Sequence, residues 1–198
     1  MEDGKLTYMR TERRDAAKNR QRILDTALML FEQHGVEQVS MNQIAIEAGI
    51  GPGTLYRRYR NKGELCLDLI KDNVVLLFED IDMYFEQNQS EPPSLRLKGI
   101  LSLFIRFREN KAQLLKGVED SEVTNRKKSR SPLYDELNQI IVNLFNEINA
   151  EKESQKNSVF QADMLLTVLK SDSYLFQREI RGYTPEEILE QICEIFIS

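Results

Sequence analysis

Residues 40–59 read Ser-Met-Asn-Gln-Ile-Ala-Ile-Glu-Ala-Gly-Ile-Gly-Pro-Gly-Thr-Leu-Tyr-Arg-Arg-Tyr, and this stretch decides the fold of the N-terminal part of the chain. Ser40 and Gln43 have the spacing of a capping box, in which each side chain accepts a hydrogen bond from a free backbone N–H at a helix start. Gly49 ends that helix, and Pro52 suits the first position of the next one. The stretch therefore predicts two short helices joined by a tight turn.

The two predicted helices, residues 40–48 and 52–59, form a helix-turn-helix if they can cross closely. Ala45 and Ala48 supply the small side chains that a close crossing needs, and Ile50 supplies an apolar side chain for the turn. A helix-turn-helix places its second helix in the major groove of DNA. The pattern therefore predicts a DNA-binding domain.

The second helix of this pair has two different faces. Leu55 and Tyr59 are four residues apart, so they share a face that we expect to be buried. The other side chains point away from that face and would reach a DNA groove: Thr54, Tyr56, Arg57 and Arg58.

The distribution of charge agrees with a DNA-binding head. The 198-residue chain carries 27 Lys and Arg against 32 Asp and Glu, a net charge of −5. Residues 1–63 hold 11 basic and 8 acidic side chains, whereas residues 64–198 hold 16 and 24. A basic head on an acidic body is typical of a nucleic-acid binder. The alternative interpretation is a chance basic cluster on a solvated face.

Helical periodicity continues along most of the chain, and the punctuation consists of helix starts and stops. Further helices are predicted at residues 18–34, 61–85, 95–108, 111–118, 131–151, 158–177 and 185–197. Residues 87–93 and 121–131 are polar and are predicted as loops. The sequence therefore predicts an all-α protein of about nine helices, with no sheet.

Composition excludes several classes of function. Two cysteines and one histidine cannot form a Cys/His zinc site or a disulfide framework, so we expect no metal, no cofactor and a reducing, cytoplasmic location. Cys66 and Cys193 are interpreted as small hydrophobic residues of helices. No paired carboxylates and no nucleophile–base pair can be named, so the chain is not predicted to be an enzyme. No apolar run is long enough to predict a membrane span.

Three stretches, residues 19–31, 39–50 and 53–65, resemble the N-terminal domain of the TetR-type (TetR/AcrR-like) transcriptional regulators. The block Gly-Thr-Leu-Tyr at residues 53–56, followed by Lys62, is the most specific part of the resemblance. The resemblance implies an all-helical, homodimeric repressor. It would have a three-helix DNA-binding domain with a helix-turn-helix and a larger C-terminal helical bundle that binds a ligand and dimerises.

The resemblance also implies roles for individual residues. The residues that would contact DNA are Ser40, Asn42, Gly53, Thr54, Tyr56, Arg57, Arg58 and Lys62. Ser40 caps its helix and would also donate to a phosphate, Lys62 would bind a phosphate, and Gly53 would let the backbone approach the DNA. Gly51-Pro52 departs from the polar side chains of many relatives. Asn42 stands where arginine is frequent, and it would pair with either adenine or a phosphate.

The predicted organisation is a flexible basic arm at residues 1–17, the helix-turn-helix domain at 18–63, and a ligand-binding and dimerisation domain at 64–198. The homodimer would form through the helices at 158–177 and 185–197. The implied function is a ligand-responsive repressor that binds a pseudo-palindromic operator of double-stranded DNA, with no membrane part. The alternative is an architectural or cell-cycle DNA-binding protein with the same head and no small-molecule effector.

Two apolar stripes on the predicted helix 158–177 suggest the dimer. One stripe includes Ala162 and Leu166, and the other includes Phe160 and Met164. A helix that is apolar on two sides is predicted to be buried on both, once against its own domain and once against a partner. Charges at Leu166 and at Ile192 of the last helix are therefore predicted to separate the subunits.

The effector is predicted to be small and apolar or amphipathic, because helical bundles bind such ligands between their helices. The lining residues are not readable from the sequence. Arg106 and Arg108 lie within an apolar helix, and one of them facing inward would suit an anionic ligand. The alternative for both is a solvated face.

Overall fold

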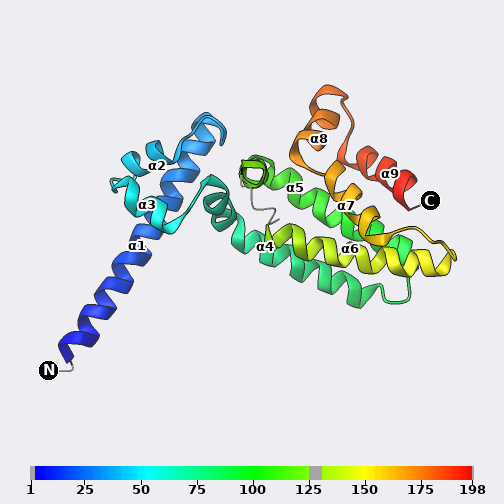
Figure 1. Ribbon diagram of the computed structural model, residues 1–198, viewed down its shortest axis with the longest axis horizontal. Coiled ribbons are helices and arrows are strands. Elements are labelled where there is room, and N and C mark those ends of the chain that lie inside the picture. The colour runs from blue at the N-terminus through cyan, green and yellow to red at the C-terminus, as the bar shows by residue number, and fades with distance from the viewer. Residues whose placement is uncertain (1–2, 125–130, 198) are drawn as a thin grey trace. The chain divides into compact units, whose positions relative to one another are not determined.

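The computed structural model describes residues 3–124 and 131–197 of the chain, with side chains for residues 16–120 and 131–197. As predicted, this described part is all-helical, with nine α-helices, one π-helical segment and no strand (Figure 1). The elements are α1 (Asp3–His34), α2 (Met41–Glu47), α3 (Pro52–Arg58), α4 (Lys62–Gln87), α5 (Pro93–Thr124), α6 (Pro132–Glu151), α7 (Ser158–Val168), α8 (Ser171–Leu175), the π-helical η1 (Phe176–Ile180) and α9 (Pro185–Phe196).

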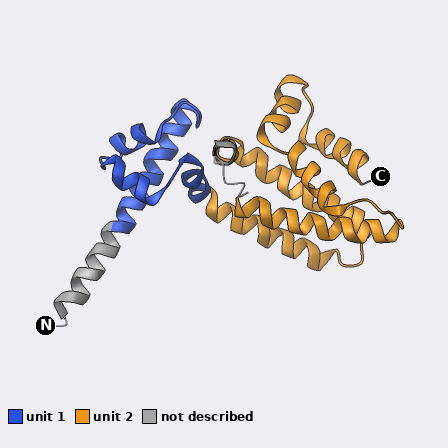
Figure 2. Ribbon diagram, in the orientation of Figure 1, with its two compact units in different colours: residues 1–69 blue, residues 70–198 orange. Residues whose placement is uncertain are grey.

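The chain divides into two compact units, residues 1–69 and 70–198 (Figure 2). The division falls inside α4, a few residues after the domain boundary that we expect between residues 63 and 64. The first unit, called here the N-terminal unit, carries the predicted helix-turn-helix. The second, the C-terminal unit, carries α5 to α9.

In the N-terminal unit, α2 contacts both α1 and α3. Its core consists of apolar side chains from these helices: Ile23, Ala27, Phe31, Ile44, Ala45 and Leu55. α1 begins at Asp3 rather than near residue 18, since the preceding segment lacks proline and is rich in helix-forming arginine and alanine. The side chains of the predicted basic arm before residue 16 lie outside the described residues.

Capping boxes are present at the start of α2, where the sequence predicts one, and at the start of α9. The Gln43 amide donates to Ser40 Oγ at 3.2 Å, while the Ser40 amide donates to the Gln43 side chain at 2.8 Å. Thr184 and Glu187 form the same reciprocal pair at the start of α9, at 3.1 and 2.8 Å. These boxes satisfy backbone donors that have no partner inside the helix, and therefore they fix where each helix begins.

In the C-terminal unit, α5 contacts α6, α8 and α9, and α7 contacts the same three helices. The apolar side chains of the first half of α5 are buried, among them Leu97, Ile100, Leu101, Phe104 and Ile105. Their burial on several sides of one helix indicates that this half of α5 lies at the centre of the bundle.

The backbone of α5 is interrupted at Lys111, whose φ of −130° and ψ of 21° are not helical. The break falls at the first residue of the second of two helices that the sequence predicts here, at residues 95–108 and 111–118. Residues before and after Lys111 therefore belong to two helical segments that meet at a kink.

The helix predicted at residues 158–177 is instead broken after α7. Leu169 ends α7, and Lys170 is extended, with ψ of 154°. The amide of the next residue, Ser171, donates to the carboxylate of Glu119 at 2.6 Å instead of to a carbonyl of α7. A buried carboxylate from another helix thus supplies the hydrogen bond that the backbone loses at the break.

The structure corrects the residues chosen for the dimer interface. Leu166 and Ile192 are buried within their own chain, at 4% and 6% exposure, so charges there would disrupt the fold itself. The other stripe of α7 is exposed and includes Phe160 and Met164. On α9, the exposed apolar side chain is Ile195, which is 72% accessible.

Candidate nucleic-acid interface

The turn between α2 and α3 has the predicted construction. The Ile50 amide donates to the carbonyl of Ala45 at 3.0 Å, and the Gly49 amide donates to the carbonyl of Ile46 at 3.0 Å. Gly49 has a φ of +62°, a left-handed conformation in which a side chain would be strained. Ala45 and Ala48 are buried where the helices cross, while Ile50 is half-buried rather than fully buried.

The two faces of α3 differ as predicted. Leu55 is fully buried and Tyr59 nearly so, whereas the next residue after Leu55, Tyr56, is 44% exposed. The exposed positions of the predicted DNA-contacting set are Ser40, Asn42, Gly53, Tyr56, Arg57 and Arg58, and the partly exposed ones are Thr54 and Lys62. Most of the set thus lies on the accessible surface of one helix-turn-helix.

The arginines of α3 make weak contacts within the unit. Arg57 donates to Thr54 Oγ1 at 3.3 Å, and Arg58 donates to the carbonyl of Ala16 at 3.4 Å. Both bonds are exposed and are long for charged donors. Their guanidinium groups are therefore accessible to an anionic partner.

Lys62 is placed differently from the arginines. Its ammonium donates to the carbonyls of Val36 at 2.5 Å, Val39 at 2.8 Å and Glu37 at 3.2 Å. These carbonyls belong to the loop between α1 and α2, and three bonds use all three N–H groups of a lysine. In this structure Lys62 holds the loop that leads into Ser40.

A partly buried polar cluster joins α1, the end of α3 and the start of α4, and it was not predicted from the sequence. Arg20 of α1 donates to both carboxylate oxygens of Asp68 on α4, at 2.9 and 2.5 Å. Tyr59 Oη donates to the same carboxylate at 2.5 Å. Burial and this hydrogen bond raise the pKa of Tyr59, and the Asp68 carboxylate raises the pKa of Arg20. The cluster fixes the residue that ends α3 against α1 and α4.

The C-terminal unit contains a second candidate site, built around a buried charge. Arg108 is 1% exposed, whereas the side chain of Arg106 is 68% exposed and lies 3.6 Å from Asp80. Of the two arginines considered for an inward position, Arg108 is therefore the one that faces the interior.

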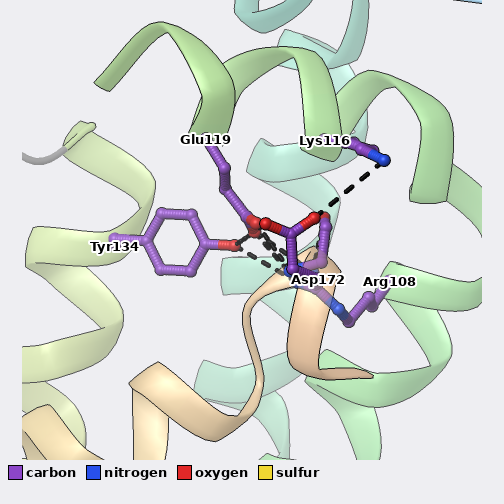
Figure 3. Close-up of polar contacts among 6 residues, drawn as sticks. Arg108, Lys116, Glu119, Tyr134 and Asp172 are labelled. Atoms are coloured by element: carbon purple, nitrogen blue, oxygen red, sulfur yellow. Dashed lines mark hydrogen bonds and ion pairs between the residues drawn. The ribbon is translucent and has the colours of Figure 1, made fainter. Parts of the chain in front are cut away.

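Arg108 forms a buried cluster with Glu119, Tyr134 and Ser171, called here the Arg108 cluster (Figure 3). Arg108 donates to Glu119 Oε1 at 3.1 and 3.2 Å, to Ser171 Oγ at 2.7 Å and to Tyr134 Oη at 3.2 Å. Tyr134 in turn donates to Glu119. The figure also shows Lys116 directed at Asp172, 4.0 Å away. The cluster brings together residues of α5, α6 and α8.

A neighbouring network lies closer to the surface. Tyr174 Oη donates to Glu109 at 2.7 Å, and Arg178 donates to both oxygens of Glu109 at 3.0 Å. The hydrogen bond from Arg178 lowers the pKa of Glu109, and burial raises the pKa of Tyr174. The ring of Tyr174 also lies 5.3 Å from the Arg108 guanidinium, a cation–π distance.

Metal binding and membrane insertion have no support in the described residues. Among their side chains, no group of three or more His, Cys, Asp or Glu could hold a metal ion. No described helix combines the length and the apolar character of a bilayer span. Cys66 is buried, and burial raises the pKa of the Cys193 thiol.

Comparisons with known proteins agree on one group. The family model of bacterial regulatory proteins of the tetR family matches residues 23–69. The HTH-type transcriptional regulator SAUSA300_2515 of Staphylococcus aureus (strain USA300) is 30% identical over 186 residues, which cover 94% of this chain and 96% of that protein.

Two solved structures share the fold. The lauroyl-CoA complex of Thermus thermophilus FadR, a TetR-family transcriptional repressor, has a TM-score of 0.66 at 18% identity, covering 90% of this chain and 93% of that one. Pseudomonas aeruginosa NalD, the secondary repressor of the MexAB-OprM multidrug efflux pump, has a TM-score of 0.57 at 18% identity, covering 91% and 96%. Both extend the likeness beyond the helix-turn-helix to the C-terminal helices.

Proposed function

We propose that this chain, which belongs to the TetR family of bacterial regulatory proteins, is a ligand-responsive repressor that binds a pseudo-palindromic operator as a homodimer. Membership of the family makes it a DNA-binding transcriptional regulator and not an enzyme. The observation that carries the proposal is the orientation of α3. Leu55 is buried while Tyr56, Arg57 and Arg58 are exposed, so the helix offers a polar and basic surface to a groove.

The proposed contacts divide by chemistry. The residues of the proposed DNA surface are Ser40, Asn42, Gly53, Thr54, Tyr56, Arg57, Arg58 and Lys62. Arg57 and Arg58 bind phosphates or base edges, and Tyr56 reaches into the groove. Lys62 acts by holding the loop before Ser40, because three carbonyls already accept its hydrogen bonds.

Gly53 supports a close approach of DNA. Among the described residues, a Cβ at Gly53 would meet no atom within 4 Å outside its own stretch of helix, and the φ of Gly53 is not positive. Neither packing against the described residues nor the backbone conformation therefore requires glycine at this position. The missing side chain leaves room for a partner's backbone to approach from outside.

The dimer is proposed to form through the segments 158–177 and 185–197. Exposed apolar side chains on these segments support it: Val159, Phe160, Met164, Val168 and Ile195. These side chains lie on two helices that contact each other, α7 and α9, and exposed apolar side chains gathered in this way are typical of a protein–protein interface. Two-fold symmetry would place two recognition helices in successive major grooves of the operator.

The effector is proposed to be a small apolar or amphipathic molecule that binds in the C-terminal unit. The related fold of Thermus thermophilus FadR, which is in complex with lauroyl-CoA, supports an amphipathic ligand for this chain. The buried Arg108 supports a ligand with a negative charge. In this proposal the protein acts in the cytoplasm, where the operator is.

Selection of bound fragments from the source genome tests the function. We expect a small set of fragments that share an inverted repeat, bound by a species of two chains in sedimentation velocity. Phe160→Glu together with Ile195→Glu should give folded monomers that no longer retain a full operator. A parent chain that sediments as a monomer at micromolar concentration contradicts the homodimer, and recovery of fragments without a shared sequence favours the architectural alternative.

A further inference from the structure

The Glu119 carboxylate sits in a receptor made by other parts of the C-terminal unit. Four hydrogen-bond donors converge on it: two N–H groups of Arg108, the hydroxyl of Tyr134 and the backbone amide of Ser171. Arg108 is buried to 1% exposure and Ser171 to 2%. Oε1 accepts from Arg108 and Tyr134, and Oε2 accepts from Ser171, so the donors recognise the charge and both oxygens of a carboxylate. Such a set satisfies any carboxylate that has the same position.

The receptor and its occupant come from different segments. Arg108 lies before the kink of α5, Tyr134 lies on α6 and Ser171 begins α8. Glu119 reaches the receptor from the segment of α5 beyond Lys111, where the backbone is not helical. A rotation of the backbone at Lys111, where the helix is already interrupted, is the movement that would withdraw Glu119 from these donors.

Arg108 also keeps unused capacity for a ligand. Its Nε is buried and has no hydrogen-bond partner within the described residues, although arginine has five N–H groups to offer. A buried ion pair contributes little net stability compared with a well-packed apolar pair, so stability alone is a weak reason for this one. An unpaired buried donor is a cost that a ligand oxygen within reach of Nε can remove.

The surroundings of the receptor are aromatic. The Phe104 ring meets the Tyr134 ring edge-on at 6.2 Å, and the Tyr174 ring lies 5.3 Å from the guanidinium. A ligand that takes the receptor therefore combines a carboxylate with an apolar body.

We propose that Arg108 anchors the effector, that the effector is an apolar carboxylate, and that Glu119 occupies its place in the unliganded protein. The proposal rests on the ligand-responsive function proposed above and names the chemistry of its ligand. Binding exchanges one carboxylate for another at Arg108, so no buried charge is left unpaired, and Glu119 is released together with the segment beyond Lys111.

The first test uses chemical rescue on the full-length protein. Glu119→Ala removes the carboxylate but leaves the receptor, and we expect a lower melting temperature that rises with millimolar acetate. Acetamide, and sodium chloride at equal ionic strength, should have no such effect. A rise of the melting temperature that is equal for acetate and chloride overturns the receptor.

The second test asks whether an external carboxylate competes with Glu119. The probes are octanoate and its neutral analogue octanamide, with the change in melting temperature as the measure of binding. Glu119→Gln should bind octanoate at least about tenfold more tightly than the parent, since the competing charged acceptor is gone. Equal affinity of both proteins, or equal response to octanamide, overturns the proposal.

Matched arginine variants locate the anchor. Arg108→Gln should abolish the octanoate response, whereas Arg106→Gln on the exposed face of the same helix should retain it. If Arg108→Gln fails to fold, the result for Glu119→Gln decides by itself. Operator binding without octanoate is measured in parallel, so a chain that binds its operator but ignores the carboxylate overturns this inference and leaves the repressor function standing.

Discussion

The arginines of α3 in the N-terminal unit and Arg108 in the C-terminal unit carry their charges in opposite environments. In the N-terminal unit, Arg57 and Arg58 lie on the surface of α3 with weak internal bonds. In the C-terminal unit, Arg108 lies in the interior and gives four hydrogen bonds to three side chains. An exposed cation can meet a large anion such as DNA, whereas a buried one can respond only to a molecule small enough to enter.

Because of this difference, substitutions of the exposed arginines should affect DNA binding, whereas substitution of the buried arginine should affect the stability of the fold. An exposed ion pair contributes about 0–1 kcal/mol, so a substitution on the outer face of α3 should leave the fold intact. Removal of one partner of a buried pair leaves the other charge without compensation. The surface of the N-terminal unit should therefore tolerate mutations that the interior of the C-terminal unit does not.

The largest expected effect contrasts Arg108 with Arg106. Arg108→Gln should lower the free energy of unfolding by about 3–5 kcal/mol, because it leaves the Glu119 carboxylate buried without its cation. Arg106→Gln, on the exposed face of α5, should change it by less than about 0.5 kcal/mol. Urea denaturation followed by circular dichroism measures both. If the two variants lower the free energy of unfolding equally, burial of the charge at Arg108 has no particular importance for stability.

The next effect contrasts two adjacent residues of α3. Tyr56→Ala should weaken operator binding about a thousandfold, since loss of a contact residue costs about 2 kcal/mol and a dimer has two heads. Its melting temperature should stay close to that of the parent. Leu55→Ala should instead cost about 2–5 kcal/mol of stability, because Leu55 is fully buried.

Fluorescence anisotropy with the selected operator, together with a thermal melt, distinguishes the two variants. A Tyr56→Ala protein that unfolds at a much lower temperature than the parent shows that Tyr56 belongs to the core. In that case the orientation of α3 proposed here is wrong.

Most of the N-terminal unit could be predicted because its signals are local. Ser40 and Gln43, or the neighbours Leu55 and Tyr56, are so close in sequence that helical geometry alone settles how they lie relative to each other. The cap of α2 and the two faces of α3 follow from that spacing, and the structure confirms both.

The polar interactions that the sequence did not reveal join distant residues. Arg108 meets Glu119, Tyr134 and Ser171 across 11, 26 and 63 positions. No periodicity encodes such pairs, so both an inward and a solvated position for Arg108 were compatible with the pattern. The break after α7 has the same origin, because it depends on the bond from Ser171 to Glu119.

Lys62 tests, within the N-terminal unit, the distinction between residues that bind DNA and residues that stabilise the fold. Each phosphate contact that is lost should reduce the slope of log K against log salt by about 0.9, or about 1.8 for a dimer. Arg57→Met should show this reduction. Lys62→Met should weaken operator binding and lower the melting temperature with an unchanged slope, because its ammonium bonds to Val36, Glu37 and Val39 rather than to DNA.

The parent, Arg57→Met and Lys62→Met are compared by anisotropy at several salt concentrations. A reduced slope for Lys62→Met with an unchanged melting temperature indicates that Lys62 leaves the loop and contacts phosphate in the complex.

The smallest expected effect concerns Glu109 and Arg178, which form an ion pair closer to the surface of the C-terminal unit. This pair shows whether the large cost expected at Arg108 is specific to a fully buried charge. Arg178 lowers the pKa of Glu109 below its ordinary value of 4.5, so the ionised carboxylate is favoured in the folded state. The resulting stabilisation is complete above pH 4.5 and is lost as the pH falls through the pKa of the folded protein. Glu109→Gln should therefore be less stable than the parent at neutral pH, and the difference should shrink as the pH falls below 4.5.

Arg178→Gln should give the same profile, and the double variant should lose little more than either single one, because both remove the same pair. Urea unfolding between pH 7 and pH 3 provides the measurement, and a difference that stays constant over this range contradicts a stabilising role for the ionised Glu109.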